Sequence, residues 1–154
     1  MLTLALDPSS TACGWALFYG RELHCYGAVR RQKKQDQWAY AWAVQHAVPT
    51  SKDRVVYEIN DGASIPRKRQ RSMRIAHEAT GRILQALGVA GEPIQADNRK
   101  KPARREEMRL IYGVPDSASE HAVDAIALGH RVVSEIKAQK GPSPKRTRPR
   151  QTTS

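Results

Sequence analysis

The chain has 154 residues, 40% of them hydrophobic and 27% charged, which is enough for one globular domain and too little for two ordinary ones. Its 26 basic residues outnumber 15 acidic ones and give a net charge of +11, which favours a polyanionic partner, either nucleic acid or an anionic membrane surface. No apolar run approaches the roughly eighteen residues of a transmembrane helix. Two cysteines are too few for a disulfide framework or a four-cysteine zinc site, so we expect a cytoplasmic protein.

The first thirty residues predict three strands, over residues 2–6, 14–19 and 22–29. Pro8 and the two serines that follow it form a turn between the first two strands. Because the connections are too short for crossover helices, we expect these strands to be antiparallel.

Helices and strands alternate in the rest of the chain. The last helix is expected to begin at Ser117, because Glu120 three residues later completes a capping-box pattern. The expected order predicts an α/β fold, in which three antiparallel strands are followed by parallel strands and helices flank the sheet. The remaining elements are expected at residues 36–48 (helix), 54–59 (strand), 72–87 (helix), 93–96 (strand), 103–112 (helix) and 117–138 (helix).

Residues 140–154 contain no aliphatic or aromatic side chain. Such a segment cannot offset its ordering entropy by burial. We therefore expect a domain over residues 1–139 and a flexible basic tail over residues 140–154.

Three carboxylates occupy positions that a purely structural protein seldom uses. Asp7 follows an apolar strand directly, Glu58 lies within the strand of residues 54–59, and Asp124 lies in a helix rich in alanine, valine and isoleucine. Taken singly, each has an ordinary alternative: a turn residue, an edge-strand surface acid and a solvated helix face. Together, in a basic chain, they indicate a site for divalent cations, because Mg²⁺ prefers oxygen ligands and two cations can promote phosphodiester hydrolysis.

His121 lies three residues before Asp124 and shares its helix face. It could ligate a metal or act as a general base, although a lone helical histidine is more often structural. Glu120 also shares the face of Asp124 and is the alternative fourth site residue; the capping role is the preferred interpretation for it.

Three motifs resemble the RuvC-type Holliday-junction resolvases. Residues 4–17, LALDPSSTACGWAL, are similar to the opening hairpin of that family, with Ser9 where the family has a glycine. Residues 55–58, VVYE, resemble its central strand, and residues 119–130, SEHAVDAIALGH, resemble its last catalytic helix.

This resemblance implies a ribonuclease H-like fold, a homodimer, and Mg²⁺-dependent cleavage of four-way or other branched DNA in a bacterium or its phage. It assigns Asp7, Glu58, His121 and Asp124 as the metal-binding catalytic set. We expect two Mg²⁺ ions per active site, with Mn²⁺ as a possible substitute. Trp38 and Trp42, four residues apart, are expected to pack in the core or at the dimer interface, with stacking on nucleic-acid bases as the alternative.

Basic clusters precede the tail at three places, and loops at that end of the sheet would meet the phosphates around the cations. Lysine and arginine there supply affinity and little sequence information. By the resemblance, Lys100, Lys101 or Arg105 approaches the scissile strand. The predicted nucleic-acid-binding residues are Arg30, Arg31, Arg67, Lys68, Arg69, Arg71, Arg74, Arg99, Lys100, Lys101, Arg104 and Arg105.

The leading interpretation is therefore a structure-selective DNA endonuclease that resolves Holliday junctions. A YqgF-type ribosomal-RNA processing nuclease is the alternative enzyme. A nucleic-acid-binding module without chemistry is disfavoured, because the acids that would repel phosphate are retained.

Overall fold

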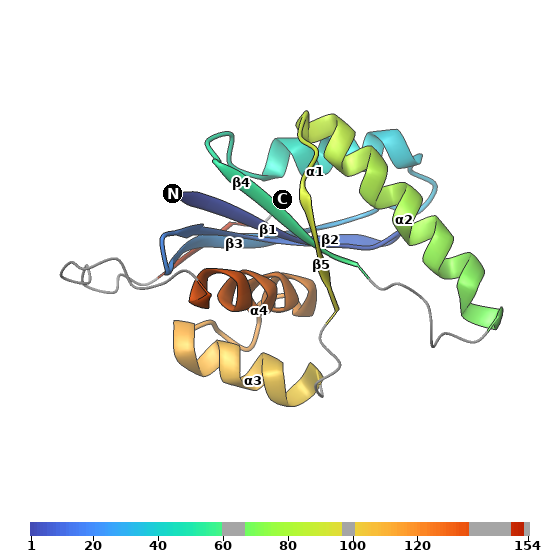
Figure 1. Ribbon diagram of the computed structural model, residues 1–154. Helices are drawn as coiled ribbons and strands as arrows, with labels where there is room; N and C mark the ends of the chain where they lie inside the picture. The colour runs from blue at the N-terminus through green and yellow to red at the C-terminus, as the bar shows by residue number, and fades with distance from the viewer. Residues whose placement is uncertain (60–66, 97–100, 136–148, 153–154) are drawn as a thin grey trace.

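A computed structural model describes residues 1–59, 67–96, 101–135 and 149–152, which form one mixed sheet between two layers of helices (Figure 1). The sheet has the strand order β5-β4-β1-β2-β3-β6. Its strands are β1 (Leu2–Pro8), β2 (Ala12–Tyr19), β3 (Glu22–Arg30), β4 (Arg54–Ile59), β5 (Glu92–Gln95) and β6 (Arg150–Gln151).

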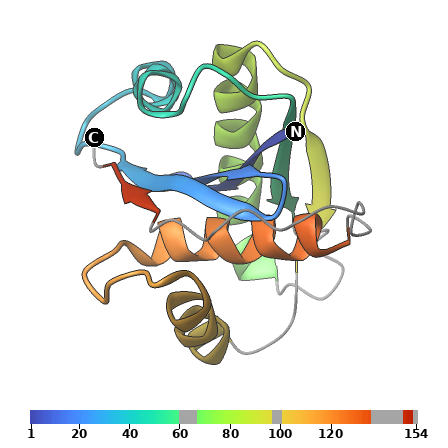
Figure 2. The same ribbon diagram turned by 90° about the vertical axis from the view of Figure 1, so that its left-hand side faces the viewer.

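The strand directions confirm the predicted fold class. The first three strands are antiparallel neighbours, and β4 pairs in parallel with β1, as β5 does with β4. Helices α1 (Gln37–Ala47) and α2 (Arg67–Leu87) cover one face, and α3 (Lys101–Tyr112) and α4 (Glu120–Ser134) lie on the other (Figures 1 and 2).

The side chains of β1 contribute to the hydrophobic cores on both faces of the sheet, because successive side chains of a strand point to opposite faces. Leu4 and Leu6 pack with Tyr40 and Val44 of α1 and with α2. Ala5 packs on the opposite side with residues of α4. A strand buried on both faces explains the uninterrupted apolar run at the start of the chain.

Helix α4 lies unusually close to the sheet, and two glycines permit this approach. A Cβ on Gly14 of β2 would lie 1.8 Å from the carbonyl oxygen of His121, and one on Gly129 of α4 would lie 2.1 Å from the Phe18 ring. The helix is correspondingly buried from Ala122 to Gly129.

Two predicted helix starts were wrong by three residues or more. Helix α2 begins at Arg67, because the basic residues that precede Ser72 are good helix formers with no breaker among them. Helix α4 begins at Glu120, capped by Ser119, whose side chain accepts a hydrogen bond from the backbone N–H of His121. The predicted capping box from Ser117 is therefore absent.

Strand β6 was not predicted. It pairs in parallel with β3, matching Cys25 with Arg150 and Tyr26 with Gln151, as the short red arrow beside β3 shows in Figure 2. The rest of the predicted tail, residues 140–148 and 153–154, lies outside the described residues. Among the described helices, none combines the length and apolar character required to cross a bilayer.

Candidate active site

Asp7 and Glu58 lie at the same end of neighbouring parallel strands. Leu6 of β1 pairs with Tyr57 of β4, so the next residue along each strand is one of the two acids. Their predecessors on the same faces, Ala5 and Val56, are register partners packed against α4. Alternation therefore directs both carboxylates toward α4.

Helix α4 brings His121 and Asp124 over this end of the sheet. Gly14 pairs with Asp7 across β1 and β2, and the backbone of His121 lies directly against Gly14. Nδ1 of His121 is 3.5 Å from Oδ2 of Asp7. The structure thus brings together the four predicted site residues, which come from three separate elements.

The turn after Asp7 is fixed by a contact that the sequence did not reveal. The hydroxyl of Tyr40, on α1, donates a 2.9 Å hydrogen bond to the carbonyl of Ser9. The Ser9 hydroxyl donates to the carbonyl of Ala12 at 2.8 Å and accepts from its N–H at 3.1 Å. Ser9 therefore closes the turn through its hydroxyl, where the resembling family has a glycine.

The acids of the cluster lie close enough for their charges to act on one another. Burial raises the pKa of the Glu58 carboxyl, and the charge of Asp7 raises it further, whereas Arg104 and Lys101 lower it. The contact with Asp7 raises the pKa of His121, which outweighs the opposite effect of burial. The charge of Asp7 thus favours a proton on both Glu58 and His121.

Asp124 is the most enclosed of the acids and is already paired. Its side chain is 7% exposed, and its Oδ1 and Oδ2 accept hydrogen bonds from Nε and Nη2 of Arg105, each at 2.9 Å. Nη2 of Arg104 lies 4.0 Å from Oδ1. Glu120, the alternative fourth site residue, is largely exposed, and its Oε2 lies 3.3 Å from Nη1 of Arg105. The residue of α4 that contacts Asp7 is His121.

The donor chemistry of the cluster suits a hard divalent cation. Asp7, Glu58 and Asp124 offer carboxylate oxygens, the ligands that Mg²⁺ prefers, and His121 offers a nitrogen that Mn²⁺ also accepts. In the part of the chain that the structure describes, no three acidic, histidine or cysteine side chains are arranged around one common cation position.

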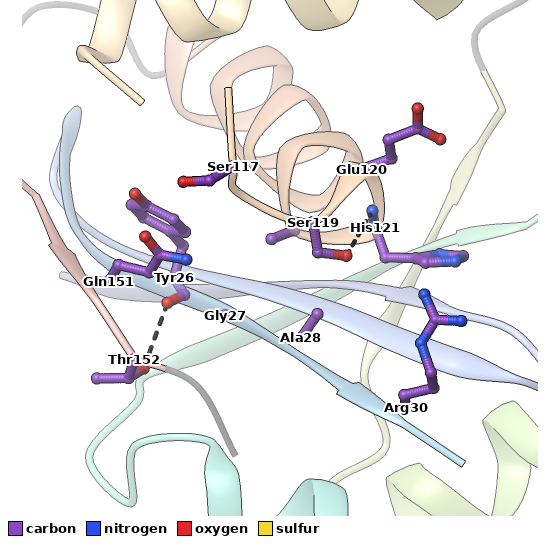
Figure 3. A pocket seen from close by; sticks show the side chains of 11 residues that line it. Tyr26, Gly27, Ala28, Arg30, Ser117, Ser119, Glu120, His121, Gln151 and Thr152 are labelled. Carbon is purple, nitrogen blue, oxygen red and sulfur yellow. Dashed lines mark hydrogen bonds between the residues drawn. The ribbon is translucent and has the colours of Figure 1, made fainter. Parts of the chain in front are cut away.

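A cleft of about 440 Å³ lies beside His121, between β3, β6 and the start of α4 (Figure 3). Hydroxyl groups of Ser117 and Ser119 line it from the α4 side, and Thr152 lines it from the β6 side. Arg30 enters it from the end of β3, near the ring of His121 in Figure 3. The cleft therefore borders the cluster at His121, whereas Asp7, Glu58 and Asp124 are not among the residues that line it.

The predicted nucleic-acid-binding residues fall into different surroundings. Arg30 is exposed, as are Lys101 at the start of α3 and four arginines along the first half of α2, Arg67, Arg69, Arg71 and Arg74. The side chain of Arg31 is partly buried, and its Nε donates to the carbonyl of Gln35. Arg99, Lys100 and the side chain of Lys68 lie outside the described residues.

Arg104 and Arg105 lie beside the acid cluster rather than on the exposed basic surface. Arg104 is buried, and Arg105 is bound to Asp124, because the enclosed carboxylate requires cationic neighbours. The sequence distinguished neither from the exposed cations, since burial on a short helix depends on packing against α4.

Comparison with known proteins places this geometry in a fold family. The sequence matches no protein-family model and no curated protein. Two solved structures of Thermus thermophilus RuvC are similar, and one of them is in complex with a Holliday junction substrate; both are 16% identical to this chain. Each covers 88% of this chain and 96% of the RuvC chain, with TM-scores of 0.59 for the complex and 0.61 for the other structure. The chain therefore has the RuvC-like variant of the ribonuclease H-like fold, as its motifs predicted.

Proposed function

We propose that this chain is a structure-selective DNA endonuclease that cleaves Holliday junctions by Mg²⁺-dependent phosphodiester hydrolysis. The observation that carries the proposal is the convergence of Asp7, Glu58, His121 and Asp124 at one end of a RuvC-like sheet. A similar structure that holds a Holliday junction substrate supports this choice of nucleic acid.

The acid cluster provides the proposed catalytic groups. Asp7, Glu58 and Asp124 are the oxygen ligands for two Mg²⁺ ions, and His121 is the nitrogen ligand or general base beside Asp7. Bound Mg²⁺ would supply an activated water and stabilise the leaving oxygen of the phosphodiester. Burial first, and the charge of Asp7 second, raise the pKa of Glu58, and a carboxylate in such surroundings gains from a cation nearby, which supports this assignment.

The exposed cations provide the proposed nucleic-acid surface. Arg30 borders the cleft beside His121, where a phosphate of the bound strand would lie near the acids. The arginines of α2 line an exposed helix and would hold a duplex arm through its phosphates.

We further propose a symmetric homodimer, because two symmetric nicks in a four-way junction require two equivalent active sites. Trp38 and Trp42 of α1 are 41% and 50% exposed, so the core-packing alternative for them is wrong. The dimer interface is the role proposed for them, and stacking on nucleic-acid bases is the alternative. Sedimentation of the free and junction-bound protein tests this; a monomer in both states would contradict it.

The cleavage test compares matched substrates. The protein is incubated with Mg²⁺ and a four-way junction, a linear duplex or a structured RNA of equal length. We expect symmetric nicks in the junction alone, and no nicks from Asp7→Asn, which keeps its affinity for the junction because Asp7 holds no phosphate. Preferential cutting of the RNA would instead support ribosomal-RNA processing. Equal cutting by Asp7→Asn at saturating Mg²⁺ would remove Asp7 from the site.

A further inference from the structure

The pair between Arg105 and Asp124 engages both oxygens of a proposed cation ligand. Both carboxylate oxygens of Asp124 accept from the guanidinium at 2.9 Å, and the Asp124 side chain is almost fully enclosed. The same guanidinium lies 3.3 Å from Glu120, one helical turn before Asp124. Arg105 thus spans two acids on one face of α4.

A bidentate arginine takes one lone pair of each carboxylate oxygen and places a positive charge beside both of them. The charge-assisted bonds of such a pair are strong, and burial shields them from water. A cation that binds the same oxygens therefore has fewer lone pairs to use and is repelled by the guanidinium, so its binding is weakened while the pair persists. Arg105 comes from α3, so its side chain can turn away without moving α4.

We propose that Arg105 is an internal counterion of the active site, which competes with a divalent cation for Asp124 and weakens cation binding until it leaves that carboxylate. This inference rests on the proposed function, because it assigns Asp124 as a ligand of the catalytic cation. It gives Arg105 a positioning and regulating role rather than a catalytic one.

Mn²⁺ titration without nucleic acid tests the competition directly. Isothermal titration calorimetry or electron paramagnetic resonance measures the dissociation constant of Mn²⁺ for the full-length protein. We expect Arg105→Gln to lower this constant about tenfold, since the lost pair involves two hydrogen bonds between charged groups. Arg105→Lys should lower it about threefold, because an ammonium keeps the charge but cannot satisfy both oxygens in a fork.

The matched control is Arg109→Gln. Arg109 lies one turn farther along α3, and its Nη2 donates to the carbonyl of Ala118 at 3.5 Å. This variant removes the same charge from the same helix but should leave the Mn²⁺ dissociation constant within twofold of wild type. A gain of equal size in Arg109→Gln would show that net charge alone is responsible and would overturn the proposal.

Folding of the variants is checked by circular dichroism. Arg104 remains 4.0 Å from Asp124 in Arg105→Gln, so the carboxylate keeps one cationic neighbour. If this variant fails to fold, Arg105→Lys decides the question. An unchanged Mn²⁺ affinity in Arg105→Lys would then overturn the proposal. Combining Arg105→Gln with Asp124→Asn should abolish the gain, because the contested oxygens are then altered.

The remaining outcomes separate this inference from the proposed function. If wild type cleaves the junction and Arg105→Gln has an unchanged Mn²⁺ affinity, the counterion proposal is refuted and the proposed nuclease function stands. If Arg105→Gln gains Mn²⁺ affinity but wild type cleaves no substrate, the proposed nuclease function is refuted and the counterion proposal stands. Failure of wild type and all variants to bind Mn²⁺ would overturn the inference.

Discussion

Gly14→Ala should disable the active site without touching a catalytic side chain. The added Cβ would lie 1.8 Å from the carbonyl oxygen of His121 and 2.7 Å from the backbone nitrogen of Ala122. The first distance is about 1.2 Å short of the 3.0 Å below which Cβ contacts essentially do not occur. Both opposing atoms belong to backbone, so the start of α4 has to move away from β2 by roughly that amount.

The displacement sets the expected magnitude. A shift of about 1 Å in a catalytic group costs about 100-fold in rate, so we expect that loss in junction cleavage. Overpacking of this kind costs about 1–3 kcal/mol of folding free energy, which lowers the melting temperature of a chain this size by about 2–12 °C.

Single-turnover cleavage at saturating protein and Mg²⁺ measures the rate independently of affinity, and thermal melting measures stability. Gly81→Ala is the matched control, because Gly81 lies exposed in α2 and a Cβ added there would meet no atom within 4 Å. This control should keep the wild-type rate and gain about 0.5–1 kcal/mol from helix propensity. A rate for Gly14→Ala within threefold of wild type would refute the assigned role of the close approach.

Three further predictions concern the acids and the basic surface. Glu58→Gln should raise the melting temperature at neutral pH, because ionised Glu58 destabilises the fold wherever the pH exceeds its raised folded pKa. The gain in melting temperature should vanish in acid, where Glu58 is protonated, and a constant gain from pH 4 to 8 would contradict the prediction. His121→Asp should retain substantial cleavage and His121→Ala should lose most of it. Wild-type cleavage should fall as the pH drops through the raised pKa of His121, because a ligand or base requires the neutral ring. Full cleavage activity per folded molecule in His121→Ala would show that this histidine is structural. Replacing Arg67, Arg71 and Arg74 together by glutamine should reduce the slope of log junction affinity against log salt concentration by up to about three counterions, measured by fluorescence anisotropy. An unchanged slope would show that the nucleic acid does not bind along α2.

Much of the fold could be predicted because its signals are local. The apolar run before Asp7 and the short connections after it indicate a buried strand and two antiparallel neighbours. The start of α2 was missed because the arginines before Ser72 were interpreted as a loop, although arginine is a good helix former. Strand β6 has two polar residues and no pattern of its own, so only its pairing with β3 identifies it.

The candidate site was predictable by residue but not by contact. Alternation and the parallel pairing of β1 with β4 are enough to place Asp7 and Glu58 on the same face of the sheet at the same end. The pairing of Asp124 with Arg105 joins residues nineteen apart in sequence, across the interface of two helices, and no sequence pattern distinguishes that arginine from Arg104. The bond from Tyr40 to Ser9 was equally hidden, since it depends on the docking of α1 against the first turn.

The pairing of β6 with β3 also bears on self-association. An edge strand carries a row of peptide groups that can template pairing with another chain, which makes exposed edges a source of aggregation. Here Arg150 and Gln151 pair with this edge, and the N–H of Thr152 bonds to the carbonyl of Tyr26 at 3.0 Å. Gly27 admits the returning segment, since a Cβ there would lie 2.3 Å from the carbonyl oxygen of Thr152. A chain shortened before residue 149 would leave this edge uncovered and should aggregate at lower concentrations than the full-length protein.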